Sequence, residues 1–449
     1  MRTRHVALVA MSGVRVVDPK LREIGLTLPG FVERGKVIAS LPSLGLLTLA
    51  ALCPTDWEPS YVEIDELGPD AANEITGMKP DLVAISSLSA RVDDAYALAE
   101  AIQRAGIPVV IGGLHATVLP DEALRHATAV VAGDGELAWQ RVLADAAVGK
   151  LAGIYKNQGY CFADGDPVPR YDLLDVEKYN RLTLQASRGC PLDCSFCAAS
   201  RLLGPPRRKP ISQIRRELEA ILRIWPRPFI ELADDNTFLA NRWSAELLDL
   251  FSEYRIKWFT ETDISIADKP NLLDKLADSG CVQVLIGLES AVPESLATVD
   301  PRGWKRRRME RYAESVARIQ TAGVSVNGCF VLGFDQDGPE VFEETLAMIG
   351  QLDLAEVQLT ILTPFPGTST YAQLRQQKRL FFDRFWDKCT LFDLTFRPKR
   401  MSAEEFHAGF LWLVRQVYSQ QATAARKKRF RSCVRERFRK EKAKACAKS

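Results

Sequence analysis

Short apolar runs alternate with longer amphipathic stretches over most of this chain. In the first third, we expect strands at residues 6–10, 61–64, 82–86, 109–111 and 129–131. We expect helices between them, at residues 44–51, 93–105 and 120–125. Apolar strands that alternate with helices are typical of a parallel sheet covered on both faces. We therefore predict a doubly wound, Rossmann-like α/β domain over residues 1–146, in which a ligand would bind at the carboxyl ends of the strands.

A second alternating series begins at residue 181. We expect its strands at residues 182–186, 229–232, 257–262, 282–288, 325–332 and 356–362. We expect its helices at residues 211–224, 242–254, 269–279, 309–322 and 340–352. Six consecutive β/α units predict a partial (β/α)6 barrel over residues 181–375, with an active site at the carboxyl ends of the strands.

The remaining segments connect and extend these two domains. Residues 147–180 contain several Gly and Pro residues and no long periodic run, which is typical of a linker. Residues 376–425 predict a small, mostly helical region with one amphipathic helix at 403–419. Residues 426–449 form a basic tail, with twelve Lys or Arg against two Glu. The tail could bind a nucleic acid or an anionic surface, but it has only two aromatic residues for base stacking, so a solvated, frayed end is the simpler interpretation.

Bulk properties exclude several classes of protein. The 449 residues are 47% hydrophobic and 26% charged with a net charge of +2, as in an ordinary soluble chain. Ten cysteines without a repeated spacing do not fit a disulfide scaffold, so we expect a reducing, cytoplasmic location. The apolar run at residues 6–10 is too short for a signal sequence, and no run of about 20 apolar residues predicts a membrane span.

Three of the cysteines stand together in the segment SRGCPLDCSFC, residues 187–197, directly after the first strand of the second series. Cys190, Cys194 and Cys197 cannot all pair as disulfides with one another. Thiolates are soft ligands, and three of them could hold three irons of a cubane cluster while the fourth iron stays open to a substrate or cofactor. A zinc site would need a fourth ligand, and the next Cys is Cys281. A chance grouping or a partial zinc site is the alternative.

With this motif the chain resembles the radical S-adenosylmethionine enzymes. In that family a C-x3-C-x2-C loop holds a four-iron four-sulfur (4Fe-4S) cluster, and the residue before the third Cys is usually aromatic, as Phe196 is here. The resemblance implies that the open iron chelates the amino and carboxyl groups of S-adenosylmethionine. One electron from the cluster would then break a carbon–sulfur bond and give a 5′-deoxyadenosyl radical.

The resemblance extends to residues at the ends of the later strands. Asp234 and Asp235 match an acidic segment that contacts the methionine amino group in this family. Glu289 matches a position that often contacts the cofactor, and Gly333 ends a segment that backs the adenine. Together with Phe196 these are the candidate S-adenosylmethionine contacts. Ordinary turn chemistry is the alternative for each residue alone, whereas their order after the cysteine loop supports the family.

The first domain resembles the cobalamin-binding domains of one subgroup of this family. Ser86 to Leu88, and Gly112 with Gly113, resemble two of the three elements of that fold. In the family, small residues there let the nucleotide tail of cobalamin approach the backbone. The third element, D-x-H-x-x-G, whose His would ligate cobalt, is missing from the sequence.

The histidines leave the cobalamin prediction open. The four that do not fit the missing element are His5, His115, His126 and His407. His115 is expected only to hydrogen-bond in a loop. Two further segments, residues 42–47 and 133–136, recur in the subgroup, where cobalamin can bind without a protein His. Cobalamin therefore stays an expected cofactor, and a domain that keeps the fold but has lost the cofactor is the alternative.

The resemblance implies cobalamin-dependent methylation. The 5′-deoxyadenosyl radical would take a hydrogen atom from an unactivated carbon of a small molecule or lipid. Methylcobalamin would supply the methyl group, and a second S-adenosylmethionine would restore it. An electron donor such as flavodoxin or ferredoxin is an implied partner. The sequence identifies neither the substrate nor a catalytic residue.

Two alternatives to methylation stay open. Within the enzyme class, the alternative is a rearrangement, cyclisation or other group transfer without cobalamin. In a different class, an iron–sulfur binding or sensing protein would use its basic tail to bind nucleic acid.

Overall fold

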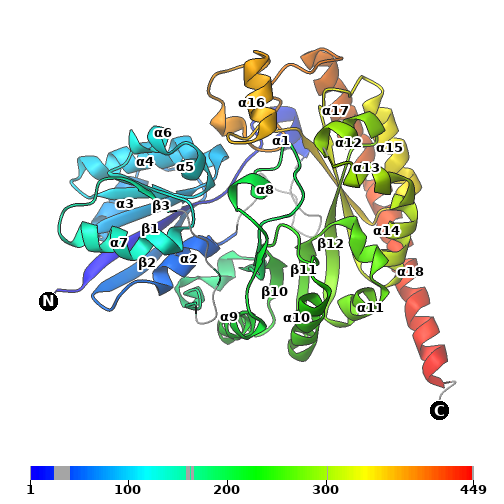
Figure 1. Ribbon diagram of the computed structural model, residues 1–449, viewed down its shortest axis with the longest axis horizontal. Coiled ribbons are helices and arrows are strands. Elements are labelled where there is room, and N and C mark those ends of the chain that lie inside the picture. The colour runs from blue at the N-terminus through cyan, green and yellow to red at the C-terminus, as the bar shows by residue number, and fades with distance from the viewer. Residues whose placement is uncertain (1, 25–40, 158–161, 163–165, 301, 447–449) are drawn as a thin grey trace.

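The computed structural model of the protein describes all residues except 1, 25–40, 158–161, 163–165, 301 and 447–449. Two parallel sheets flanked by helices lie side by side, with the N-terminal sheet at the left of Figure 1 and the second sheet at its centre and right. Among the described helices, none has both the length and the apolar character that crossing a bilayer requires.

The first sheet has six parallel strands in the order β2-β1-β3-β4-β5-β6. Their bounds are β1 Arg4–Met11, β2 Trp57–Ile64, β3 Leu82–Ser87, β4 Val109–Gly112, β5 Ala129–Ala132 and β6 Gly153–Lys156. The direction of strand addition reverses at β1 and β3, and such a switch point opens a ligand crevice. The predicted doubly wound domain is confirmed, with one correction: β6 pairs with β5 and lies inside the segment 147–180 that was predicted as a linker.

Helices cover both faces of this sheet. On one face lie α3 (Ala71–Gly77), α4 (Val92–Arg104), α5 (Leu114–Val118) and α6 (Pro120–Leu124). On the other face lie α2 (Leu44–Ala51) and α7 (Gly135–Ala147). Neighbouring residues of β1 pack into opposite layers, since Val9 belongs to the core under α4 and Leu8 to the core under α2. Because both faces are buried at the centre of the sheet, β4 and β5 are continuous apolar runs, whereas the edge strand β2 is only partly buried and carries polar residues.

The chain leaves the first sheet briefly after β1. Leu21, in α1 (Pro19–Ile24), is buried in the core of the second domain. The Asp393 carboxylate holds this segment by accepting hydrogen bonds from the backbone N–H groups of Val17 at 3.0 Å and Asp18 at 2.8 Å. Residues 17–24 lie within the domain predicted over residues 1–146, but they contact the second domain and the C-terminal region.

The second sheet also has six parallel strands, and its order follows the chain. The strands are β7 Leu182–Leu184, β10 Phe229–Leu232, β11 Lys257–Glu261, β12 Cys281–Glu289, β13 Ser325–Leu332 and β14 Glu356–Ile361. The helices between them include α9 Ile211–Ile224, α10 Asn241–Tyr254, α11 Pro270–Asp278, α14 Tyr312–Thr321 and α15 Val341–Leu352. The consecutive order with β7 and β14 at the two ends is the order of a partial barrel.

Local signals at the helix ends explain several of these boundaries. α17 (Ala403–Val417) begins at a capping box, in which Ser402 and Glu405 each satisfy the backbone N–H of the other. α11 begins with a proline at its first position. α10 ends at Arg255, whose left-handed backbone, with φ of +51°, stops the helix.

The strand predicted at residues 182–186 is divided in two. β7 ends at Leu184, and the next two residues after a break form β8 (Ser187–Arg188). β8 pairs in antiparallel fashion with β9 (Arg207–Arg208). This two-stranded ribbon joins the two ends of the segment that carries the three cysteines.

The C-terminal region covers the open edge of the second sheet. Tyr418 lies between α17 and α18 (Gln420–Cys446). Its hydroxyl donates to the Val357 carbonyl of β14 at 3.0 Å and accepts from the Leu359 N–H at 3.1 Å. Free strand edges invite pairing with other chains, so this side chain protects β14 from such pairing.

The basic tail is part of the long helix α18, so the prediction of a frayed end is wrong for its described part. Arg429 forms an ion pair with Asp353, and Arg437 forms one with Asp278 at 3.1 Å. Arg426 is buried and donates to the Val417 carbonyl. These cations attach the first part of α18 to the second domain, whereas the last part of the helix projects away from the domain (red in Figure 1).

Candidate functional site

The cysteine loop lies at the carboxyl ends of the second sheet, as predicted. Cys190, Cys194 and Cys197 line one cavity of about 280 Å³, which we call the thiol cavity. Inward-facing residues of four strands form its wall: Glu261, Leu285, Gly287, Glu289, Cys329, Val331, Gln358 and Thr360. Its size is close to the lower end of the range for small-molecule sites, about 300–1,000 Å³.

The two aspartates after β10 hold the start of the cysteine loop. Asp234 accepts hydrogen bonds from the backbone N–H groups of Ala186 and Ser187 at 2.8 and 2.9 Å. Asp235 accepts one from the Gly189 N–H at 2.7 Å. The described lining of the thiol cavity includes Asp235 but not Asp234. The structure therefore places Asp235 where a cofactor could touch it and gives Asp234 a positioning role, with its pKa raised to about 6 by burial.

The second half of the loop is fixed by the far side of the domain. The Ser195 N–H donates to the Val299 carbonyl at 3.0 Å, and the Ser195 carbonyl accepts from the Thr370 N–H at 3.1 Å. Phe196 lines the thiol cavity, and its ring centroid lies 5.9 Å from that of Phe334. Phe196, a predicted contact of S-adenosylmethionine, therefore lies in the wall of the thiol cavity.

The arrangement of the thiols suits a cluster better than a single ion. Among the described residues, no group of three His, Cys, Asp or Glu side chains could hold one metal ion. A 4Fe-4S cluster has a different requirement, because each of its thiolate ligands binds a separate iron and the three thiols need not converge on one ion. Burial raises the pKa of the Cys194 thiol to about 12, against the opposing charge of Lys305. Such a thiol is a poor nucleophile at neutral pH, whereas a metal ion deprotonates its thiol ligands.

A buried ion pair lies on the cavity wall opposite the loop. Lys305, in α13 (Trp304–Arg308), donates to Glu289 Oε1 at 2.7 Å and to the Gly287 carbonyl at 2.8 Å. Burial alone would lower the pKa of Lys305, but the Glu289 charge outweighs it and raises that pKa. Glu289 has a φ of +69°, a strained conformation that often marks functional sites. The predicted Glu289 thus reaches the cavity, together with a lysine that was not predicted.

Gln358 and Glu261 are further cavity residues that were not predicted. The Gln358 side-chain oxygen is buried without a hydrogen-bond partner. Since buried polar atoms are normally paired, this oxygen fits a donor on a bound cofactor or substrate. The Glu261 side chain is exposed within the cavity, where the partial loss of solvent around its carboxylate raises its pKa to about 8, with a further increase from Glu231. The alternation of polar residues at positions 356, 358 and 360 was the available signal, because such residues face one side of a strand.

Gly333 belongs to a supporting loop and is not among the described lining of the thiol cavity. Its φ is +109°, and an added Cβ would lie 3.2 Å from the Phe396 ring. Its N–H donates to Asp337 at 2.8 Å, and the other carboxylate oxygen of Asp337 accepts from the Ser295 hydroxyl at 2.6 Å. The structure therefore gives Gly333 a conformational role, whereas its neighbour Val331 lines the cavity.

A second cavity, of about 270 Å³, opens at the carboxyl ends of the first sheet, and we call it the glycine cavity. Ser86, Gly112 and Gly113 line it, as predicted for a cofactor tail. Gly113 has a φ of +103°, and a Cβ there would lie 3.0 Å from the Ser87 carbonyl oxygen. Leu88 is not among its described lining residues and lines a neighbouring cavity instead.

The loop after β5 forms another wall of the glycine cavity. Residues 133–136 all line it, in agreement with the segment singled out in the sequence. Gly133 has a φ of +101°, and a Cβ there would lie 2.9 Å from Asn157 Oδ1. The absence of side chains at Gly133 and Gly135 leaves the backbone open to a ligand, which is what a nucleotide tail would require.

A third, mostly apolar cavity lies between the other two, and we call it the middle cavity. Leu88 and His115 line it from the first domain. It shares the lining residues Phe365 and Leu391 with the thiol cavity. It shares Leu114 and Leu202 with the glycine cavity. The three cavities therefore form one series that runs from the cysteine loop to the first sheet.

One ring nitrogen of His115 is engaged, whereas the other, the buried Nε2, has no hydrogen-bond partner among the described residues. Its Nδ1 lies 3.0 Å from the Ser89 hydroxyl, and its Nε2 lies 3.6 Å from the Glu122 carboxylate. Burial lowers the pKa of His115. The expected hydrogen bond is present, but His115 belongs to helix α5 rather than to a loop.

Two family profiles match the chain. That of the Radical SAM superfamily matches residues 184–349, which include the cysteine loop and strands β10 to β13. That of the B12 binding domain matches residues 34–143, which include the glycine cavity. Each match falls on one of the two sheets, although β1 and β6 of the first sheet and β14 of the second lie outside the matched residues.

Proteins that are similar in sequence or in structure support the same assignment of the two domains. The chain is 28% identical to the bacteriochlorophyllide d C-12(1)-methyltransferase of Chlorobaculum tepidum over 88% of this chain and 86% of that protein. It is 25% identical to the hopanoid C-2 methylase of Rhodopseudomonas palustris over 77% of this chain and 67% of that one. The radical S-adenosylmethionine methyltransferase TsrM from Kitasatospora setae, solved with cobalamin and a [4Fe-4S] cluster, has the same fold. Its TM-score is 0.69 at 16% identity, with 92% of this chain and 89% of that chain covered. The chain therefore contains a radical S-adenosylmethionine domain preceded by a B12-binding domain.

Proposed function

We propose that this enzyme methylates an unactivated carbon of an apolar small molecule or lipid. The observation that carries the proposal is the series of three cavities. The thiol cavity has the ligands for a 4Fe-4S cluster and polar groups for S-adenosylmethionine. The glycine cavity has the exposed backbone that a cobalamin tail requires, and the middle cavity connects the two.

When bound, the cluster and S-adenosylmethionine supply a carbon radical that abstracts hydrogen, and cobalamin supplies the methyl group. The protein contributes position and exclusion of water, as it does in cofactor enzymes generally. Asp235 keeps the cysteine loop in place, while Glu289 and Gln358 offer polar contacts inside the thiol cavity. Leu88 and Leu114 give the middle cavity an apolar wall, which keeps water from a reactive intermediate.

The substrate class follows from the middle cavity and from the relatives. Apart from Ser89, His115 and Thr390, the lining of the middle cavity consists of apolar residues and Cys389. An apolar substrate would bury its surface there without leaving polar groups unpaired. The two curated relatives are named for a bacteriochlorophyllide and a hopanoid, both largely apolar ring systems, and we extend that class to this chain.

The reaction also needs electrons from outside. One electron starts each cleavage of S-adenosylmethionine, and we propose that a flavodoxin or ferredoxin supplies it in a reducing cytoplasm. The seven other cysteines have no role in this proposal, which rests on Cys190, Cys194 and Cys197.

Anaerobic reconstitution tests the proposal. The protein would receive iron, sulfide and hydroxocobalamin, and bound cobalamin per chain would be measured by absorbance after desalting. We expect about one cobalamin per chain. Gly113→Val should lower retention, because its side chain would meet the Ser87 carbonyl and enter the cavity. Gly149→Val, at a surface glycine with a similarly positive φ and no neighbour within 4 Å, is the matched control.

A second measurement identifies the reaction. Methyl transfer requires S-adenosylhomocysteine and 5′-deoxyadenosine in about equal amounts per methylated product. If the cluster forms but no cobalamin binds, methylation is ruled out in favour of radical chemistry without cobalamin.

A further inference from the structure

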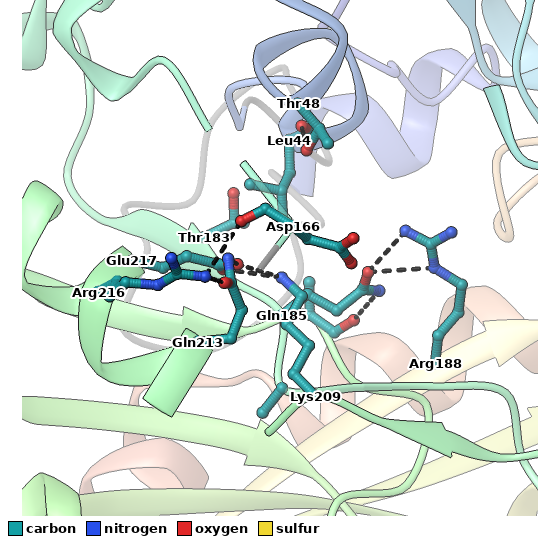
Figure 2. A network of polar contacts seen from close by, with 12 residues as sticks. Leu44, Thr48, Asp166, Thr183, Gln185, Arg188, Lys209, Gln213, Arg216 and Glu217 are labelled. Atoms are coloured by element: carbon teal, nitrogen blue, oxygen red, sulfur yellow. Dashed lines mark hydrogen bonds and ion pairs between the residues drawn. The ribbon is translucent and has the colours of Figure 1, made fainter. Parts of the chain in front are cut away.

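Arg188 connects the glycine cavity to the chain segment that leads into the cysteine loop. It lies in β8, two residues before Cys190, and its side chain lines the glycine cavity. Its guanidinium lies 3.3 Å from the Asp134 carboxylate and 3.2 Å from that of Glu136. It also donates to Gln185 Oε1 at 3.0 Å, as Figure 2 shows. One side chain thus joins the loop after β5 to the strand that leads into the cysteine loop.

The link is shielded from solvent. The side chains of Arg188, Asp134 and Glu136 are 15%, 10% and 15% exposed. Charges so placed are screened much less by salt than surface charges are. A guanidinium has five donors in a fixed plane, so it can hold two carboxylates and an amide together more rigidly than the three donors of a lysine ammonium can.

On the side of the second domain, two hydrogen bonds hold the backbone around Arg188. The backbone on either side of Arg188 is fixed, because Asp234 binds the Ser187 N–H and Asp235 binds the Gly189 N–H. A displacement of the Arg188 side chain is therefore transmitted directly to the cysteine loop.

The partner strand of the ribbon is anchored in the same way. Arg207, in β9, forms an ion pair with Asp134 at 3.2 Å. Lys209, the residue directly after β9, is bound to Glu217 of α9 at 2.7 Å, a buried pair visible beside Gln185 in Figure 2. Both strands that close the cysteine loop are thus bound to one carboxylate at the glycine cavity.

We infer that Arg188 is a positioning residue that couples occupation of the glycine cavity to the binding of S-adenosylmethionine at the cysteine loop. The inference rests on the proposed function, since it assumes that cobalamin occupies the glycine cavity. A ligand there contacts the loop that carries Asp134 and Glu136, and Arg188 transmits the resulting shift. Such coupling is reciprocal, so each cofactor changes the affinity for the other by the same factor.

The test is a thermodynamic cycle on the full chain with a reconstituted cluster. The dissociation constant of S-adenosylmethionine is measured by anaerobic equilibrium dialysis, without cobalamin and with saturating hydroxocobalamin. In the wild type we expect cobalamin to change this constant by at least about fivefold, the lower end of typical coupling. In Arg188→Gln the constant should be the same with and without cobalamin, and Arg188→Lys should recover part of the effect.

Arg384→Gln is the matched control. Arg384 also joins the two halves of the molecule, through Asp93 and Glu122, but it is away from the cysteine loop. This variant should keep the wild-type coupling. The electron paramagnetic resonance spectrum of the reduced cluster gives a second readout. Added cobalamin should alter it in the wild type and Arg384→Gln but not in Arg188→Gln.

The outcomes are separable. Coupling that persists in Arg188→Gln, or a wild type that binds both cofactors independently, overturns the inference and leaves the proposed function intact. A wild type that binds no cobalamin overturns the proposed function and this inference with it. If Arg188→Gln fails to fold, the double variant Asp134→Asn with Glu136→Gln removes both carboxylates from the other side of the bridge and should likewise lower the coupling; full coupling there overturns the inference.

Discussion

Asp235 accepts a hydrogen bond from the backbone N–H of Gly189 at 2.7 Å, one residue before the first cysteine of the loop. The bond fixes the loop from the neighbouring strand end, and Gly189 has a φ of +86° that few other residues would adopt. A hydrogen bond to a charged acceptor contributes about 1.5–3 kcal/mol.

Removing that acceptor should loosen the cluster. We expect Asp235→Ala to release iron to a chelator about 10- to 100-fold faster than the wild type, as the lost bond energy implies. Asp235→Asn keeps an acceptor at the same place and should stay within a few-fold of the wild type. Equal release rates for Asp235→Ala and the wild type would show that Asp235 does not restrain the loop.

Cys194→Ala should abolish cleavage of S-adenosylmethionine. Two thiolates cannot replace the three that hold the cluster, so iron content and 5′-deoxyadenosine formation should fall together. Cys53→Ala is the control, because Cys53 lies at the end of α2 and is not among the described residues of the thiol cavity. Persistent cleavage in Cys194→Ala would contradict the assignment of the cluster to this loop.

Breaking the Glu289–Lys305 pair should destabilise the second domain. Lys305→Met leaves the Glu289 carboxylate buried without its partner, and such changes cost about 3–5 kcal/mol. The double variant Glu289→Gln with Lys305→Met removes both charges and should recover most of that loss. Urea unfolding of the three proteins measures the effect, and equal midpoints for all of them would rule out a structural role for the pair.

Asp337 should give the stability a specific pH dependence. Burial raises its pKa from 3.8 to about 6, although the Ser295 hydroxyl and two backbone N–H groups favour the ionised form. An acid with a raised folded-state pKa stabilises the fold most at low pH, and that contribution is lost as the pH rises from about 4 to about 6. The loss amounts to about 3 kcal/mol for a shift of this size.

Asp337→Asn isolates this contribution. An amide can accept the two N–H bonds with its oxygen and donate to Ser295 with its nitrogen, so the variant should fold. The stability difference between variant and wild type should change across this pH window and stay constant above it. A constant difference from pH 4 to pH 8 would mean that Asp337 has an ordinary pKa.

Repeating patterns made the sheets predictable from the sequence. Strands β3 and β13 are buried along their length, so they appear as apolar runs, and α9 was located at the residues where it occurs. The cysteine loop was found because three thiols at that spacing have few other uses. Ser86, Gly112 and Gly113 lie together because parallel strands end at one edge of a sheet.

Contacts between distant segments could not be read in the same way. Nothing near Lys305 in the sequence indicates Glu289, since the pair depends on how α13 folds over β12. The Asp234 carboxylate could be a ligand by its chemistry, yet it binds the backbone N–H groups of Ala186, just before β8, and Ser187, in β8. The basic tail was misread for a related reason: its partners, such as Asp353, lie on other helices and turns.

The Tyr418 hydroxyl that pairs with the edge of β14 has a consequence for biosynthesis. Tyr418 follows Val357 by 61 residues, so a ribosome adding about 5–20 residues per second delivers the strand some 3–12 s before the side chain that covers it. During that interval nascent chains on one polysome would present the same bare strand edge to each other. Crowded or fast expression should therefore favour aggregation through β14, and slower translation at low temperature with a chaperone present should give more usable enzyme.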